Sequence, residues 1–239
     1  LENKGSIFQS TSDTEILAHL IMLNAKGHRI DAIKEALIYL EGAFAFLILT
    51  KDKLYAVRDH HGLRPLSIAT LDNGYVVSSE TCAFDAIGAK FLRDIQPGEI
   101  VTFSEKGIES MYYSEDLRHH MCAMEYIYFS RPDSDIVGLN VHRFRKESGR
   151  LLARESHVDA DMVIGVPDSS LSAASGYAEE TGIPYEMGLI KNKYSGRTFI
   201  EPSQSLIEKG VKMKLSPVKS VVKDKRIILI DDSIVRGTT

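Results

Sequence analysis

The chain has 239 residues, of which 44% are hydrophobic, enough to form the cores of one large or two ordinary domains. Its 29 basic and 33 acidic residues give a net charge of −4 and are spread along the sequence, so composition predicts no nucleic-acid partner. The longest clear apolar run, Ala43 to Leu49, is too short to span a bilayer, and Cys82 and Cys122 form no disulfide framework. We therefore expect a cytoplasmic protein with no membrane partner.

The first part of the chain is predicted to be α+β. Ser12 to Glu15 has the pattern of a capping box, with Ser12 as N-cap, ahead of a helix that runs to about Leu23. A second helix is expected near Asp31 to Leu40, followed by a strand at Ala43 to Leu49. Further short strands, separated by turn residues, predict an antiparallel meander over 53–58, 66–69, 75–79, 99–103 and 108–113.

Beyond about Ser114 the pattern changes, because helices and strands then alternate. This alternation is typical of an α/β domain with a doubly wound parallel sheet. We place the boundary so that the predicted domains are residues 1–114 and 115–239. The predicted elements of the second domain are helices over 141–157 and 170–180 and strands over 162–166, 184–188 and 226–230.

Two carboxylates, Asp231 and Asp232, directly follow the aliphatic run Ile227 to Ile230, which predicts a central strand buried on both faces. Open α/β sheets bind ligands at the carboxyl ends of their strands. Ser233 to Thr239 add hydroxyls and closely spaced backbone N–H groups that suit a phosphate, while the carboxylates suit ribose hydroxyls or magnesium. The pattern indicates a site for a phosphorylated sugar. The alternative, a plain capped helix start, explains only one of these polar residues.

A second polar turn, Pro167 to Ser170, follows the predicted strand at 162–166. Its position at another strand's carboxyl end suits a pyrophosphate group. A plain helix N-cap explains Ser169 equally well, so the residues alone leave both interpretations open.

Several segments resemble glutamine phosphoribosylpyrophosphate (PRPP) amidotransferases, the amidophosphoribosyltransferase family. They are 12–20, 79–84, 125–134 and 191–200, together with the loop at 231–239. The resemblance implies part of an N-terminal-nucleophile glutaminase domain, followed by the front part of a type I phosphoribosyltransferase parallel sheet. The implied activity is glutamine-dependent transfer of ammonia to PRPP, which gives 5-phosphoribosylamine, glutamate and pyrophosphate in the first committed step of purine nucleotide synthesis.

The same resemblance implies roles for individual residues. Asp13 would hold the α-amino group of glutamine, although it could instead stabilise a helix N-terminus. Asp231 and Asp232 would bind ribose hydroxyls and Mg²⁺, and Ser169 would lie near the same metal. The remaining residues implied in binding PRPP are Lys191, Tyr194, Arg197, Ser233, Ile234, Val235, Arg236, Gly237 and Thr238.

The positions of the two cysteines determine whether we expect this chain to hydrolyse glutamine. The family's glutaminase nucleophile is an N-terminal cysteine, whereas Cys82 and Cys122 are internal and have no free amine to activate the thiol. We therefore expect a chain cut at both ends that does not hydrolyse glutamine. Some family members carry a four-iron four-sulfur cluster, and Cys122 matches one ligand position; a small buried hydrophobe is an equal alternative.

The resemblance further implies a homo-oligomer with purine nucleotides as feedback inhibitors. The basic segment from about 191 to 217 predicts a mobile lid over PRPP, with a solvated basic loop as the alternative. Two other functions stay open at this point: a different type I phosphoribosyltransferase, such as a salvage enzyme, and a regulator that binds PRPP without turnover. The first 113 residues argue against a salvage enzyme, which has no use for a glutaminase half.

Overall fold

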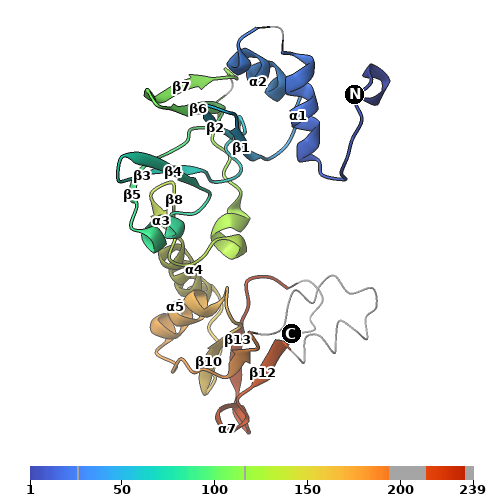
Figure 1. The fold of residues 1–239 in the computed structure, drawn as a ribbon. Coiled ribbons are helices and arrows are strands. Elements are labelled where there is room, and N and C mark those ends of the chain that lie inside the picture. The colour runs from blue at the N-terminus through green and yellow to red at the C-terminus, as the bar shows by residue number, and fades with distance from the viewer. Residues whose placement is uncertain (26, 116, 194–213, 235–239) are drawn as a thin grey trace. The chain divides into compact units, whose positions relative to one another are not determined.

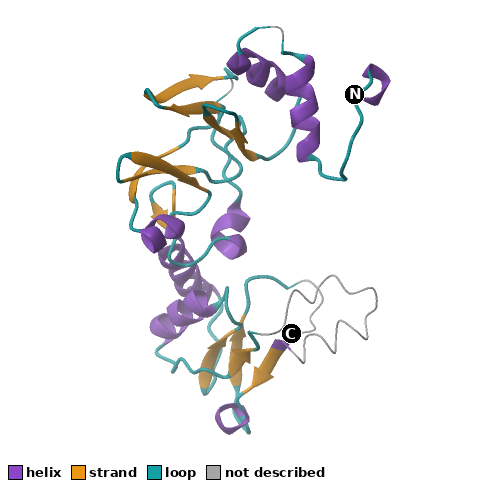
Figure 2. Cartoon of the chain, in the orientation of Figure 1, coloured by secondary structure: helices purple, strands orange, loops and turns teal. Residues whose placement is uncertain are grey.

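The computed structural model describes residues 1–25, 27–115, 117–193 and 214–234 (Figure 1). The chain divides into two compact units, Leu1–Cys122 and Ala123–Thr239. Both units combine helices with sheets, which confirms the predicted mixture of α and β structure (Figure 2). No helix within the described ranges is long and apolar enough to cross a membrane.

The first unit is built around a four-stranded antiparallel sheet whose strand order is β1-β2-β6-β7. Apolar side chains of the second helix, including Ile33 and Leu37, pack against Val57 and Ile100 of the sheet and form the main core. The elements are η1 (Glu2–Lys4), α1 (Thr14–Leu23), α2 (Arg29–Ile38), β1 (Ala45–Leu49), β2 (Leu54–Arg58), β6 (Glu99–Ser104) and β7 (Gly107–Tyr112).

A second, three-stranded antiparallel sheet of order β4-β3-β5 lies between β2 and β6 in the sequence. Its elements are β3 (Ser67–Leu71), β4 (Gly74–Ser78), α3 (Cys82–Ile87) and β5 (Lys90–Asp94). The prediction of one continuous meander is therefore wrong, because β2 pairs with β6 rather than with β3. Neither α3 nor β5 was predicted from the sequence, since α3 is a single short helix and β5 is largely exposed and lacks a clear alternation.

The start of α1 also differs from the predicted capping box. Asp13, not Ser12, occupies the N-cap position, and it makes no side-chain capping bond. The Glu15 carboxylate instead accepts hydrogen bonds from the Ser10 hydroxyl at 2.6 Å and the Gln9 amide at 2.8 Å. These bonds lower the pKa of Glu15 to about 2. Glu15 therefore stabilises the segment before the helix, at Gln9 and Ser10, and not the first turn of the helix itself.

The second unit pairs two helices closely. Added Cβ atoms at Gly149 and Gly176 would each lie 1.9 Å from a backbone oxygen, of Ala173 and Lys146 respectively, so only glycine permits this contact between α4 and α5. The elements of this unit are η2 (Glu125–Phe129), β8 (Asp135–Ile136), β9 (Leu139–Asn140), α4 (Val141–Glu155), β10 (Met162–Gly165), α5 (Leu171–Thr181), β11 (Leu189–Lys191), β12 (Leu215–Pro217), α7 (Lys219–Val222) and β13 (Ile227–Ile230).

The parallel sheet of the second unit is smaller than predicted. β10 and β13 pair in parallel, but residues 184–188 contribute only a single bridge, between Val163 and Tyr185, instead of a full strand. The chain turns away soon afterwards, because β11 forms an antiparallel pair with β12. The described sheet is therefore a parallel pair with one bridge beside it.

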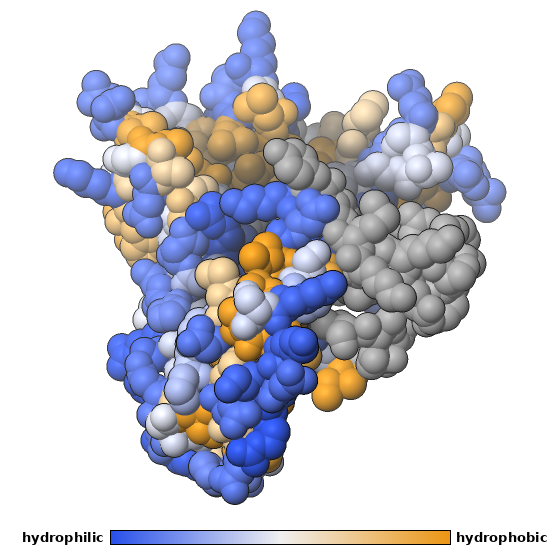
Figure 3. Space-filling view, turned by 90° about the horizontal axis from the view of Figure 1, so that it is seen from below, coloured by the Kyte–Doolittle hydropathy of each residue, from blue (hydrophilic) through white to orange (hydrophobic). Residues whose placement is uncertain are grey.

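The prediction that the strand before Asp231 is buried on both faces is also wrong. Ile228 and Ile230 pack into the core of the unit, whereas Ile227 and Leu229 are 38% and 45% exposed. Side chains alternate between the two faces of a strand, so one face of β13 is covered and the other is open. Apolar surface is visible among hydrophilic residues in Figure 3.

Candidate functional site

The register of β10 and β13 brings two polar turns to the same edge of the sheet. At the start of the pair, the Arg226 amide donates to Asp161 Oδ2, and the Asp161 amide donates to the Arg226 carbonyl, each at 2.9 Å. At the end of the pair, Gly165 lies opposite Ile230. The turn after β10 and the carboxylates after β13 therefore leave the sheet side by side, as expected for parallel strands.

Hydroxyls of the first turn bind the carboxylates of the second. Ser169 donates to Asp232 Oδ2, and the Ser170 hydroxyl donates to Asp231 Oδ1 at 3.3 Å. The Asp232 amide also donates to Asp231 Oδ1, at 2.9 Å, and the Ser233 hydroxyl donates to Asp232 Oδ1 at 2.6 Å. The structure thus brings together Ser169, Asp231, Asp232 and Ser233, four of the residues singled out from the sequence.

The paired carboxylates interact unfavourably as anions. Partial burial raises the pKa of Asp231, and the neighbouring charge of Asp232 adds to the effect, although hydrogen bonds from the Asp232 amide and from Ser170 oppose it. A cation or a set of hydroxyl donors would relieve this repulsion. The site is therefore suited to a ligand that brings positive charge or hydrogen-bond donors to the carboxylates.

The start of α5 faces the same turn. Gly165 allows the helix to approach β10, since an added Cβ would lie 3.0 Å from the Cα of Leu171 and from the Ala174 Cβ. Ser170 occupies the N-cap position without a side-chain capping bond, because its hydroxyl binds Asp231 instead. The first-turn amides of α5 are therefore not occupied by this hydroxyl, and such amides suit phosphate groups.

Lys191 reaches the first turn from another element. It ends β11, and its ammonium group forms an ion pair with Asp168. Sequence analysis implied a role for Lys191 but did not single out Asp168. The only available signal was the position of Asp168 in a polar turn at the carboxyl end of a strand.

The structure does not show the remaining predicted residues as part of this cluster. Ile234 is 92% exposed. Tyr194, Arg197, Val235, Arg236, Gly237 and Thr238 lie outside the described residues, as does most of the segment predicted to be a lid. The described ends of that segment, β11 and β12, form an antiparallel pair.

Asp13 belongs to the first unit and is the N-cap residue of α1. Its side chain is exposed, and the bond it accepts from the Thr14 hydroxyl is long, at 3.4 Å. Because this carboxylate does not cap the helix, it is open to another partner. Both cysteines are free thiols, Cys82 buried and Cys122 half-buried. Across the described ranges, no cluster of three or more His, Cys, Asp or Glu side chains could hold a metal ion by itself.

Comparison with known proteins gives consistent matches along the chain. Residues 1–86 match the model of a glutamine amidotransferase domain. The amidophosphoribosyltransferase of Bacillus subtilis is 59% identical over 239 residues, which are 100% of this chain and 50% of that protein. The same enzyme of Staphylococcus epidermidis is 56% identical over 240 residues, 100% of this chain and 49% of its own length.

Over its whole length, the chain is similar to amidophosphoribosyltransferases. This confirms the resemblance found in the sequence motifs. The solved glutamine PRPP amidotransferase of B. subtilis, complexed with ADP and GMP, agrees with a TM-score of 0.91 at 58% identity; the match covers 99% of this chain and 52% of that one. The chain spans about half the length of these curated relatives.

Proposed function

We propose that a protein containing this chain transfers ammonia from glutamine to PRPP and forms 5-phosphoribosylamine, glutamate and pyrophosphate. The observation that carries the proposal is the meeting of Ser169 and Ser170 with Asp232 and Asp231 at one edge of the β10–β13 pair. The whole-length similarity to amidophosphoribosyltransferases supports the same conclusion.

In this proposal the second unit is the front part of a type I phosphoribosyltransferase domain. Asp231 and Asp232 accept the ribose hydroxyls, while the first turn of α5 and Ser233 approach the phosphate groups. Lys191, held beside this turn by Asp168, supplies positive charge for the departing pyrophosphate. Loss of pyrophosphate from ribose C1 needs position and charge stabilisation more than covalent help from the protein.

Magnesium fits this donor set. Two carboxylates and a hydroxyl are hard oxygen ligands, and Mg²⁺ commonly binds through one or two carboxylates together with substrate phosphates rather than in a protein cage. Asp231, Asp232 and Ser169 would hold the ion, which would neutralise the pyrophosphate as it leaves. The raised pKa of Asp231 agrees with a site in which a cation offsets two adjacent acids.

The first unit is proposed to be part of an N-terminal-nucleophile glutaminase domain, in which Asp13 binds the α-amino group of glutamine. Its match to a glutamine amidotransferase domain and its exposed, non-capping carboxylate support this role. We further propose purine nucleotides as inhibitors, since the B. subtilis relative was solved with ADP and GMP. A cytoplasmic homo-oligomer, and an iron-sulfur role for Cys122, belong to the same proposal.

Separating the two half-reactions tests the proposal. In a full-length protein that contains this chain, the double substitution Asp231→Asn and Asp232→Asn should lower ammonia-dependent phosphoribosylamine formation by orders of magnitude. Glutamine hydrolysis by the complete glutaminase domain of that protein should survive. Asp13→Asn should show the reverse pattern, with glutamine use impaired and ammonia use retained. Undiminished ammonia-dependent activity in the double variant would overturn the proposed role of the carboxylates.

A further inference from the structure

The first unit contains a cavity that the proposed reaction does not use. Its volume is about 470 Å³, and its wall is formed by the start of α2 and by one face of β2, β6 and β7. Asp13 does not line it. Asp13 precedes α1, whereas α2 starts beyond the other end of that helix, and ten helical residues extend about 15 Å.

The floor of the cavity carries two residues with hydroxyl groups, and both residues are largely buried. Tyr55 and Thr102 lie directly opposite each other on β2 and β6, so their side chains share a face of the sheet. They are only 3% and 7% exposed, and neither hydroxyl has a hydrogen-bond partner among the residues that the structure describes. Because both residues line the cavity and their hydroxyls make no bond within the described residues, the two hydroxyls are available to a polar group that enters it.

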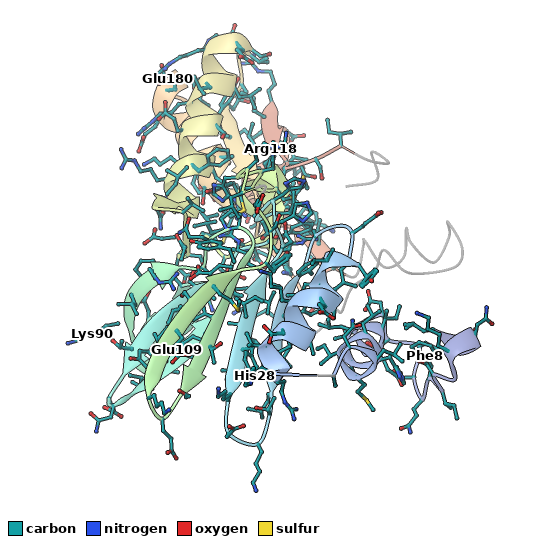
Figure 4. All side chains as sticks on the ribbon, turned by 90° about the horizontal axis from the view of Figure 1, so that it is seen from above. Phe8, His28, Lys90, Glu109, Arg118 and Glu180 are labelled. Carbon is teal, nitrogen blue, oxygen red and sulfur yellow. The ribbon has the colours of Figure 1, made fainter. Side chains whose placement is uncertain are left out.

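The rim of the cavity carries charges of both signs. Arg29 and Lys53 are basic, whereas Asp52 and Glu109 are acidic, and no ion pair joins them within the described chain. Glu109 lies opposite Thr102 on β7, so the acid is next to the hydroxyl floor. Figure 4 labels Glu109 together with His28 at the start of α2.

The start of α2 adds donors to the basic side. His28 occupies the N-cap position without a side-chain capping bond. The amides of Asp31 and Ala32 bond to the His28 carbonyl, which leaves those of Arg29 and Ile30 for another acceptor. Two free amides and a helix N-terminus favour a carboxylate at this end of the cavity.

We propose that this cavity binds a small zwitterion of the α-amino acid class. The carboxylate binds Arg29, Lys53 and the first amides of α2, the ammonium group binds Glu109, and the hydroxyls of Tyr55 and Thr102 contact the polar part between them. The charges of the two basic and the two acidic side chains cancel, so a polyanion such as pyrophosphate would be repelled by the acidic side chains. A zwitterion satisfies both signs at once.

The test uses the 239-residue chain and the common L-amino acids. Saturation-transfer NMR identifies those that bind, and calorimetry measures their affinity. At least one should bind, and its N-acetylated and C-amidated forms, which each lack one charge, should bind about tenfold more weakly or worse, since each loses a charge-assisted bond. Arg29→Gln and Glu109→Gln should weaken binding by a similar factor.

Matched variants separate binding from folding. Thr102→Val should weaken binding, whereas Thr102→Ser, which keeps the hydroxyl, should retain it. Lys90→Gln, an exposed change in the other sheet, should leave affinity unchanged (Figure 4). Asp13→Asn should also leave it unchanged, and this result separates the cavity from the proposed glutamine contact. The proposal fails if no amino acid binds, if blocked forms bind equally well, or if Lys90→Gln or Asp13→Asn weakens binding as much as Arg29→Gln.

Discussion

Two strands, β6 in the first unit and β13 in the second, have burial patterns opposite to those that their polar and apolar residues predict. β6 reads Glu-Ile-Val-Thr-Phe-Ser and contains three polar residues, yet its first five residues are all buried. β13 reads Ile-Ile-Leu-Ile, yet Ile227 and Leu229 remain 38% and 45% exposed. The apolar content of a strand therefore does not determine how its faces are covered, because coverage depends on the elements that pack there.

The packing around each strand explains the difference. Ile100 of β6 contacts the core beneath α1 and α2, whereas the adjacent Val101 contacts a second core that contains Leu66 and Ile68. Both faces of β6 are thus covered within the first unit. β13 has one covered face, through Ile228 and Ile230, and pairs with β10 on one edge.

Alanine substitutions in the two strands should give the largest contrast. Ile100→Ala removes a fully buried side chain and leaves a cavity, so we expect a loss of about 4 kcal/mol in the free energy of unfolding. Leu229→Ala, at a side chain that is 45% exposed, should cost less than about 1 kcal/mol. Chemical denaturation measures both. Equal losses would mean that β13 is covered in solution on the face that the structure leaves open.

The second prediction concerns the close contact between α4 and α5, which we expect to stabilise the second unit more than the open face of β13 does. Gly149→Ala places a Cβ 1.9 Å from the Ala173 carbonyl oxygen, so α4 and α5 must separate, at a cost of about 3 kcal/mol. Gly27→Ala is the matched control, since nothing lies within 4 Å of its Cβ position. Thermal unfolding should show a lower transition only for Gly149→Ala, and proteolysis should cleave the second unit first. Unchanged melting would contradict the close helix contact.

The third and smallest effect concerns the buried acid of β6. Burial opposes ionisation of Glu99, but hydrogen bonds from Arg93, Ser110 and the Gln96 amide outweigh it and lower its pKa. A lowered pKa means that this stabilisation is complete above the pKa of an unfolded glutamate, about 4.3, and is lost as pH falls through the folded value. Glu99→Gln should cost about 2 kcal/mol at neutral pH.

The same substitution should also flatten the pH dependence of stability below about pH 4. Glu105→Gln, at an exposed turn residue, is the control and should change neither quantity. Denaturant titrations at several pH values provide the measurement. If Glu99→Gln kept the acid-dependent loss of the wild-type chain, another group would be responsible for it.

The sequence predicted that both polar turns follow parallel strands at their carboxyl ends. The residues alone left Ser169 open between a helix cap and a ligand contact, and only the family resemblance placed it near the same metal as Asp231 and Asp232. The sequence did not predict the ion pair of Asp168 with Lys191, because that contact depends on the path of the chain into β11. It also placed β3 beside β2, since turn signals indicate where strands end but not which strands pair. Local patterns thus located the carboxylates, whereas strand partners and covered faces were set by tertiary contacts.

Equilibrium binding of PRPP in the presence of Mg²⁺ tests most directly the proposal that Asp231 and Asp232 bind PRPP. A full-length protein containing this chain should bind PRPP, and the Asp231→Asn, Asp232→Asn double variant should bind it about 100-fold more weakly, since two sets of charge-assisted bonds are lost. Asp224→Asn, an exposed change in the turn before β13, should bind like the wild type. Equal affinity in the double variant and the wild type would contradict the account.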